Sequence, residues 1–274
     1  MIERRRMLMG TNIVDDSDYL TFTALEDGTF TLTIPASVNT SYLTSVAYSL
    51  DDGVTWVTTN NTSSQITITT PTVAAGSTVK WKGIGTAYST GTSSYSSFSA
   101  TGSFSVSGNI MSLLFGDSYR GKKEIYENYA FLLLFRSSNN LTDAGNLLLP
   151  ATTLTSHCYN GMFNRCTNMT TAPKLPATTL ASYCYQNMFI YCSNLTTAPE
   201  LPATTLATNC YNSMFYNCTK LNSVTCLATD ISALGSTVGW LSNVSANGTF
   251  TKAAGVTWPT GANGIPNGWT VVEV

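Results

Sequence analysis

The sequence predicts an α+β protein in which an N-terminal β-sandwich precedes a short, capped solenoid of α/β repeats. Alternating apolar and polar residues, broken by turn residues, recur through positions 18–108, as in a sandwich of short antiparallel strands. A strict 26-residue period follows, because Cys158, Cys184 and Cys210 are 26 apart and the segment LPATTL occurs three times. Fixed periods of roughly 20–50 residues are typical of repeat architectures.

The composition is that of a globular chain with unusually few charges. Charged residues make up 10% of the 274 residues, hydrophobic residues make up 43%, and the net charge is −2. These values exclude a disordered chain and the basic footprint of a nucleic-acid-binding protein. The apolar run Met7–Met9 is too short for a secretory signal, and Tyr129–Phe135 is too short to span a membrane. We therefore expect neither a signal peptide nor a membrane span.

Residues 1–17 are predicted to form a flexible N-terminal docking tail. They contain a basic, methionine-rich stretch, which we interpret as a peptide that becomes ordered on a larger assembly. The candidate docking residues are Arg4, Arg5, Arg6, Met7 and Met9. The alternative is a terminus that is simply disordered, as many chain ends are.

Residues 18–108 are predicted to form the β-sandwich. The expected strands are 19–23, 29–34, 45–50, 54–57, 65–69, 78–82 and 98–106. Turn residues at 26–28 and 51–53 predict hairpins between the first two and between the next two of these strands. Trp56 and Trp81 are the expected core anchors. Asp51 and Asp52 fit the turn chemistry better than they fit a calcium site.

Residues 109–128 are predicted to be a linker whose apolar side chains form a plug between the two halves. The solenoid is expected to span 129–225, beginning with a degenerate repeat in which Ser138 replaces a cysteine. Each later repeat has apolar residues at positions i, i+1, i+4, i+5 and i+8. In one repeat these are Cys184, Tyr185, Met188, Phe189 and Cys192. We interpret this spacing as one face of an α-helix, so that each repeat holds a short strand, a turn and a helix.

Residues 226–274 are predicted to form a C-terminal cap, because the repeat pattern fades there. A last helix is expected at 231–241, and strands are expected at 250–252 and 269–274, with Gly-, Asn- and Pro-rich turns between them. The residues expected to cover the open end of the core are Trp240, Trp258 and Trp269.

All seven cysteines lie within the repeats or just after them. Cys158 and Cys166 would be about 12 Å apart along a helix, which is too far for a disulfide, and no CxxC pair occurs. We interpret the cysteines as buried free thiols, with disulfides or a metal site as the alternative. The only histidine, His157, aligns with Tyr183 and Asn209, which indicates a helix flank rather than a catalytic base.

The repeats follow the pattern CYxxMFxxCxxLTxAPxLPATTL, which resembles the bacterial-surface-protein class of leucine-rich repeats. Such repeats occur in surface proteins of gut Bacteroidetes and in structural proteins of their phages. The resemblance covers roughly 130–274 and implies a leucine-rich-repeat solenoid with a structural or adhesive role. The segments YSLDDGVTW and FSVSGNIMSLLFGD look like the domain that often precedes these repeats. The family supplies no catalytic residues, and its appendage proteins imply a homo-oligomer, with a trimer as the first expectation.

Comparison of the repeats separates core positions from surface positions. Cysteine, methionine and phenylalanine recur in phase, whereas the positions of Asn164 and Arg165 vary from repeat to repeat. The candidate partner-binding residues at these variable positions are Ile190, Tyr191, Tyr216 and Arg165. An uncharged face that is rich in amides and tyrosines suits a glycan or a neutral protein. The alternative is a set of scattered apolar surface residues without function.

The sequence contains no signature of catalysis. It has no phosphate-binding loop and no dinucleotide fingerprint, so we expect no enzyme, no cofactor and no metal site. The predicted function is that of a structural or adhesive phage virion protein, such as a fibre, tail or head decoration. Its N-terminal part would dock to other virion proteins, and its repeats would face a host surface protein or glycan.

The lack of a recognisable export signal favours the virion over a bacterial cell-surface leucine-rich-repeat adhesin, which is the first alternative. An intracellular scaffold or inhibitor is the more distant one.

Overall fold

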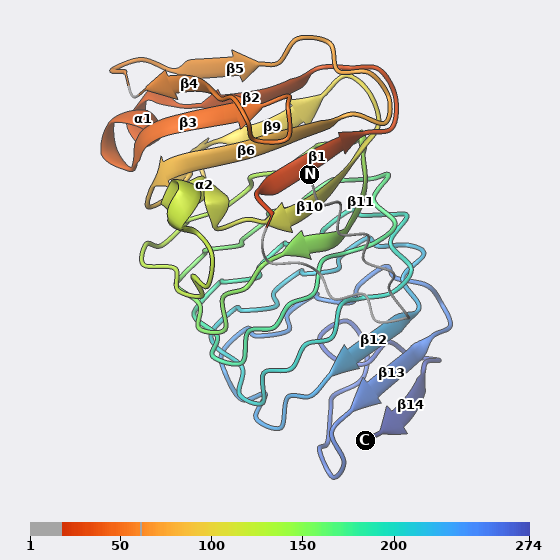
Figure 1. Ribbon diagram of the computed structural model, residues 1–274. Coiled ribbons are helices and arrows are strands. Elements are labelled where there is room, and N and C mark those ends of the chain that lie inside the picture. The colour runs from red at the N-terminus through yellow and green to blue at the C-terminus, as the bar shows by residue number, and fades with distance from the viewer. Residues whose placement is uncertain (1–17, 61) are drawn as a thin grey trace, which may run out of the picture.

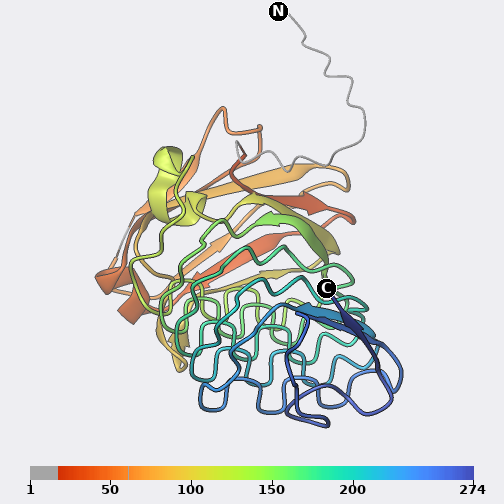
Figure 2. The same cartoon turned by 90° about the horizontal axis from the view of Figure 1, so that it is seen from below.

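The computed structural model describes residues 18–60 and 62–274. Two β-sheets form one end of the molecule, and a stack of coils extends from them to the C-terminus (Figure 1). Seen from the C-terminal end, the coils nest one behind another (Figure 2). The candidate docking residues Arg4, Arg5, Arg6, Met7 and Met9 lie outside the described residues.

The larger sheet contains six strands and the smaller one contains three. The larger runs in the order β11 (Leu141–Leu148), β10 (Phe104–Asn109), β1 (Leu20–Ala24), β6 (Thr78–Gly85), β3 (Leu43–Ser49) and β4 (Val57–Asn60). The smaller runs β5 (Ile66–Thr69), β2 (Phe30–Ile34) and β9 (Ser97–Ala100). The short hairpin β7 (Ser89–Gly91) and β8 (Ser94–Tyr95) and the helix α1 (Ala36–Ser41) complete this part. The alternating sequence of β2 explains its burial, because its apolar residues face the core and its threonines do not.

The first predicted hairpin is wrong, because β1 and β2 belong to different sheets. β1 pairs with β10 and β6, whereas β2 pairs with β5 and β9. The turn between them carries the chain across the core, so that the rings of Phe22 and Phe30 meet with centroids 5.3 Å apart. A Cβ on Gly28 would lie 2.6 Å from the backbone nitrogen of Gly102, so this corner admits no side chain. The second hairpin is confirmed, since β3 and β4 pair antiparallel.

The predicted linker is part of the core. It contains α2 (Ser112–Phe115) and the 3-10 helix η1 (Gly116–Ser118), and Ile110, Leu113 and Leu114 are buried. β10 pairs in parallel with β11, which lies in the first predicted repeat. The larger sheet therefore spans the predicted boundary between the linker and the repeats.

The predicted repeat helices are wrong, because residues 129–225, all of which the structure describes, contain no helix. Runs of tight turns take their place, and every fourth residue in a run has a positive φ. We call the runs 157–166, 183–192 and 209–218 turn rungs. Their positive-φ residues are His157, Gly161 and Arg165, then Tyr183, Asn187 and Tyr191, then Asn209, Ser213 and Asn217.

Backbone hydrogen bonds in a turn rung alternate between two directions. The Met162 N–H donates to the Tyr159 carbonyl within its own rung at 3.2 Å. The next residue, Phe163, donates instead to the Met188 carbonyl in the following rung at 2.9 Å. Half of the amides therefore close turns and half join neighbouring coils, as amides join strands in a sheet.

Two columns of aromatic side chains run through the stack. Neighbouring rings in each column are close to parallel, with centroids between 5.4 and 6.4 Å apart. The first column is Tyr88, Phe131, Tyr159, Tyr185, Tyr211, Trp240 and Trp258. The second is Phe98, Phe135, Phe163, Phe189 and Phe215. Both begin in the β-sheet part, so that part supplies the first layer of the stack.

Backbone contacts join the β-sheet part to the first coil in the same way. The Tyr88 N–H donates to the Ala130 carbonyl at 2.7 Å, and the Phe98 N–H donates to the Leu134 carbonyl at 2.8 Å. These bonds repeat the pattern by which each turn rung donates to the next.

The seven cysteines are free and buried, as predicted. The thiols of Cys166, Cys192 and Cys218 donate to the carbonyls of Phe135, Phe163 and Phe189 in the preceding coil, at 3.0–3.1 Å. Ser138 makes the same contact from the first coil to the Phe98 carbonyl of β9. The hydrogen bond is therefore kept where the residue type changes.

The C-terminal segment adds one more rung in place of the predicted last helix, which is wrong. Gly235, Gly239 and Asn243 have positive φ at the same four-residue spacing. A loop closes this rung, since the Gly239 N–H donates to Asn263 Oδ1 and the Trp240 Nε1–H donates to the Gly264 carbonyl, both at 2.9 Å. Three parallel strands flank it: β12 (Ser223–Cys226), β13 (Thr249–Lys252) and β14 (Thr270–Glu273). The three cap tryptophans are buried.

Candidate binding site on the repeats

Arg165, Tyr191 and Tyr216, three of the four residues that the sequence nominates for partner binding, form one cluster. The Arg165 guanidinium lies 4.8 Å from the centre of the Tyr191 ring. The Tyr191 and Tyr216 rings are 5.8 Å apart and meet at 76°. A cation over one ring and the edge of a second ring hold the Tyr191 side chain in a defined orientation.

The turn rungs place these residues through their backbone. Arg165 and Tyr191 occupy equivalent positive-φ positions in adjacent rungs, each with a φ of 63°. The Tyr191 N–H donates to the Tyr216 carbonyl at 2.8 Å, and the Arg165 N–H donates to the Ile190 carbonyl at 2.9 Å. Ile190, the fourth candidate, is half-buried beside the cluster. The cluster therefore follows from the repeat period and not from a loop of special shape.

A hollow of about 500 Å³ lies beside this cluster and crosses four successive coils. Each coil contributes two residues to its lining: Ser137 and Asn139, Arg165 and Thr167, Tyr191 and Ser193, and Asn217 and Thr219. The lining offers hydroxyls, amides, one guanidinium and one aromatic ring, and it contains no carboxylate. We call this the repeat hollow.

These groups suit an uncharged ligand with many hydroxyls. Serine, threonine and asparagine side chains both donate and accept hydrogen bonds, and a tyrosine ring offers an apolar surface for stacking. Hydrolysis of a glycosidic bond generally requires two carboxyl groups on either side of the bond. The lining of the repeat hollow contains no carboxyl group.

A further set of stacked rings, separate from the two buried columns, lies at the start of the turn rungs and was not among the candidates from the sequence. The His157 ring is 4.8 Å from the Tyr129 ring and 4.5 Å from the Tyr183 ring. The three residues are 28 and 26 positions apart (157−129 and 183−157), and this spacing is the signal that identifies them. These three residues also have positive φ, as Arg165 and Tyr191 do.

His157 is half-buried and lies beside the hydroxyl of its neighbour Ser156. Burial lowers the pKa of its imidazole, so the ring is neutral near pH 7. Its Nδ1 lies 2.8 Å from the Ser156 hydroxyl, but that hydroxyl donates to the Ser182 carbonyl. Because Ser156 gives its hydroxyl proton to Ser182, it can only accept a hydrogen bond from Nδ1, which leaves Nε2 as the unprotonated ring nitrogen.

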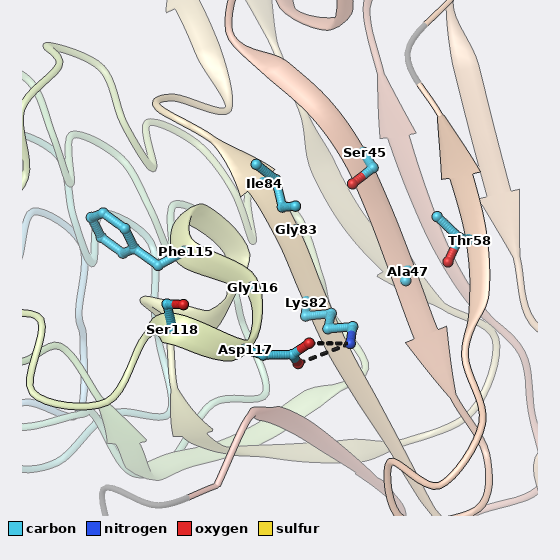
Figure 3. A pocket seen from close by; sticks show the side chains of 10 residues that line it. All are labelled: Ser45, Ala47, Thr58, Lys82, Gly83, Ile84, Phe115, Gly116, Asp117 and Ser118. Atoms are coloured by element: carbon cyan, nitrogen blue, oxygen red, sulfur yellow. Dashed lines mark hydrogen bonds and ion pairs between the residues drawn. The ribbon is translucent and has the colours of Figure 1, made fainter.

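A second hollow, of about 360 Å³, lies on the outer face of the larger sheet (Figure 3). Lys82 of β6 and Asp117 of η1 form an ion pair in its lining, with N–O distances of 2.8 and 3.0 Å. The Lys82 ammonium also lies 4.1 Å from the centre of the Trp56 ring, and Asp117 accepts the Tyr19 hydroxyl at 2.7 Å. The hydrogen bonds from Lys82 and Tyr19 lower the pKa of Asp117. Both charges are satisfied within the protein, where they hold η1 against the sheet.

Across residues 18–60 and 62–274, no group of three or more His, Cys, Asp or Glu side chains is placed to hold a metal ion. No helix in this part of the chain is long and apolar enough to cross a membrane. The sequence matches no family model, and no curated protein or solved structure matches it significantly.

Proposed function

We propose that the protein is a non-enzymatic binding protein whose repeats hold a neutral glycan or an uncharged protein surface. The observation that carries this proposal is the repeat hollow, in which Arg165 fixes Tyr191 beside hydroxyls and amides from four coils. A lining without carboxylates supports binding without turnover. The small net charge of the chain fits a partner that is itself uncharged.

The binding test replaces Tyr191 with alanine and measures binding to host cells and to a panel of immobilised glycans. We expect Tyr191→Ala to weaken binding at least tenfold, because the stacking surface is lost and the Arg165 guanidinium is left without its aromatic partner. The matched control is Tyr183→Ala, which removes a tyrosine from the first positive-φ position of the same rung, outside the repeat hollow. Equal binding by wild type and Tyr191→Ala would remove the repeat hollow from consideration.

The sequence resemblance leads us to propose that this binding protein is a phage virion appendage. Its N-terminal part would attach to other virion proteins, and its repeats would face the host. A bacterial cell-surface adhesin is the alternative and would use the same hollow. Mass spectrometry of purified particles and of the cell envelope distinguishes the two, since the virion proposal requires the chain on particles.

A deletion of residues 1–17 tests the docking role of the N-terminal region. We expect the shortened protein to fold, because it retains the buried core that runs from Leu20 to Trp269, and to be lost from particles. Particles that retain the shortened protein at the wild-type level would contradict the docking role and leave the repeat hollow unaffected.

A further inference from the structure

Large exposed apolar side chains occur in the β-sheet part and at the C-terminal end of the molecule, and they are absent from the turn rungs. The large exposed hydrophobic residues of this end are Leu234, Val238, Val271, Val272 and Val274. None of the large exposed hydrophobic residues lies between residues 129 and 225. The end of the stack is therefore a more apolar surface than its flank.

Three of these residues belong to β14 or follow it directly. Val271 is 45% exposed, Val272 is 40% exposed and Val274 is 69% exposed. β14 pairs with β13 on one side and is the edge strand of its sheet (Figure 1). Valine side chains on both faces of an unpaired edge strand are a pairing surface that proteins usually block with lysine, proline or a bulge. β14 has no lysine, proline or bulge, and its one charged side chain, Glu273, is paired with Lys252 of β13.

The backbone of β14 presents a short and symmetric set of hydrogen-bonding groups. The Thr270 N–H donates to the Gly248 carbonyl and the Val274 N–H donates to the Lys252 carbonyl, so residues 270, 272 and 274 face β13. Val271 and Glu273 consequently direct their N–H and C=O groups to the open edge. An antiparallel strand with the same spacing would satisfy all four groups.

We propose that a second copy of this chain pairs with β14 through the β14 of its own, about a two-fold axis at Val272. In this register Val271 faces Glu273 of the second copy and Glu273 faces its Val271, which gives four backbone hydrogen bonds. Val272 then faces Val272 of the second copy in the non-hydrogen-bonded position, where β-branched pairs pack well. The result is a continuous six-stranded sheet with an isologous interface.

The charges of this region are compatible with self-pairing. Glu273 is the only charged residue between 253 and 274, and it already forms an ion pair with Lys252 of β13. In the dimer each Glu273 therefore stays paired with Lys252 of its own chain. A two-fold dimer differs from the trimer expected from the sequence resemblance, and it does not depend on the proposed binding function.

The test is the oligomeric state of the full chain by light scattering and sedimentation at protein concentrations up to roughly 1 mM, because a single strand pair makes a weak dimer. We expect a wild-type dimer and a monomeric Val271→Pro variant with an unchanged circular dichroism spectrum. Proline removes an outward N–H and leaves the β13 pairing intact. The control is Val54→Lys, at an apolar site in the β-sheet part that is 81% exposed, which should remain dimeric.

A cysteine trap provides a second measurement that does not depend on the proline variant folding. The native cysteines are buried, so a Val272→Cys variant offers one accessible thiol on each chain. Facing residues in the non-hydrogen-bonded position have Cα atoms about 4.5 Å apart, within the range for a disulfide. We expect a disulfide-linked dimer for Val272→Cys and none for Val54→Cys. A monomer at all concentrations, a trimer, or a failure of Val272→Cys to cross-link would overturn the proposal.

Discussion

At the scale of single residues, one hydrogen bond between coils is made by a cysteine in three coils and by a serine in the first coil. The Cys166 thiol and the Ser138 hydroxyl both donate to the phenylalanine carbonyl one layer earlier. The sequence predicted buried free thiols here, because cysteines in phase with Met and Phe must face the same core. It did not predict their carbonyl partners, since those partners depend on how far each coil is offset from the next.

Burial should make the cysteines unreactive in the folded protein. Burial raises the pKa of Cys158, Cys210 and Cys226 to about 12, so these thiols stay protonated at neutral pH. We expect no reaction with a thiol reagent in the native protein at pH 8 and reaction of all seven in denaturant. Rapid labelling of even one native thiol would show that the core is more open than the structure describes.

Asp51 should give the turn between β3 and β4 a dependence on acid pH. Hydrogen bonds from the hydroxyl and amide of Thr55 and from the Ser49 hydroxyl lower its pKa to about 2. A lowered folded-state pKa means that the stabilisation is present above the unfolded pKa of about 3.9 and is lost as the pH falls from about 4 to about 2. Asp51→Asn should therefore lower the Tm slightly at pH 6 and not at pH 2. Melting curves across this range check the sign, and a Tm difference that is independent of pH would contradict it.

At the scale of elements, the turn rungs show why the helix prediction fails. Cys158, Met162 and Cys166 are spaced by four, whereas an α-helix advances 3.6 residues per turn, so a strict four-residue period drifts around a helix. Gly161 and Asn187 are also residue types that accept a left-handed backbone. Tyrosine, histidine and arginine at the other positive-φ positions hide this signal. Their conformation is set by hydrogen bonds to the next coil, which a single repeat does not reveal.

The same Asn→Ile substitution should cost more stability at a positive-φ position of a turn rung than at a position without positive φ. Asn187→Ile places a β-branched side chain at a φ of 58°, and we expect a loss of about 1–2 kcal/mol of stability. Asn164→Ile makes the same change at a position where the next rung already has Ile190, and it should have little effect. Urea denaturation of both variants provides the comparison. Equal losses would indicate that side-chain size, and not backbone conformation, limits these positions.

Part of the candidate site could be predicted by comparing the repeats with one another. Comparison of repeats in phase identifies Arg165, Tyr191 and Tyr216, because they break a pattern that the core positions keep. The rest of the repeat hollow was not found. Its remaining residues, such as Ser137, Thr167 and Ser193, are small polar side chains that the sequence does not distinguish from other surface positions.

At the scale of the whole molecule, the two aromatic columns join parts that the sequence separates. Tyr88 and Phe98 continue the columns into the β-sheet part, although they lie 43 and 37 residues before Phe131 and Phe135 (131−88 and 135−98). No 26-residue period marks them. The sequence thus predicted where the character of the chain changes and could not predict that both parts share one core.

This shared core should unfold as one unit. Phe98 is buried between the two sheets and stacks on Phe135, so Phe98→Ala should cost about 3–5 kcal/mol. We expect a single calorimetric transition for the wild type and for the variant, with the variant shifted to lower temperature. Two separate transitions in either protein would mean that the β-sheet part and the coils are independent domains.

The hydrogen bonds between rungs also affect how the number of repeats can change during evolution. Each rung accepts hydrogen bonds from the coil before it and donates the same bonds to the coil after it. A gene that gains or loses one whole repeat therefore rejoins surfaces that already fit. Extra residues are accommodated in the connections between rungs, as in the first coil, where Phe131 and Tyr159 are 28 positions apart (159−131) and still stack. The length of the stack can therefore change during evolution by whole repeats, while the β-sheet part and the C-terminal cap keep their packing.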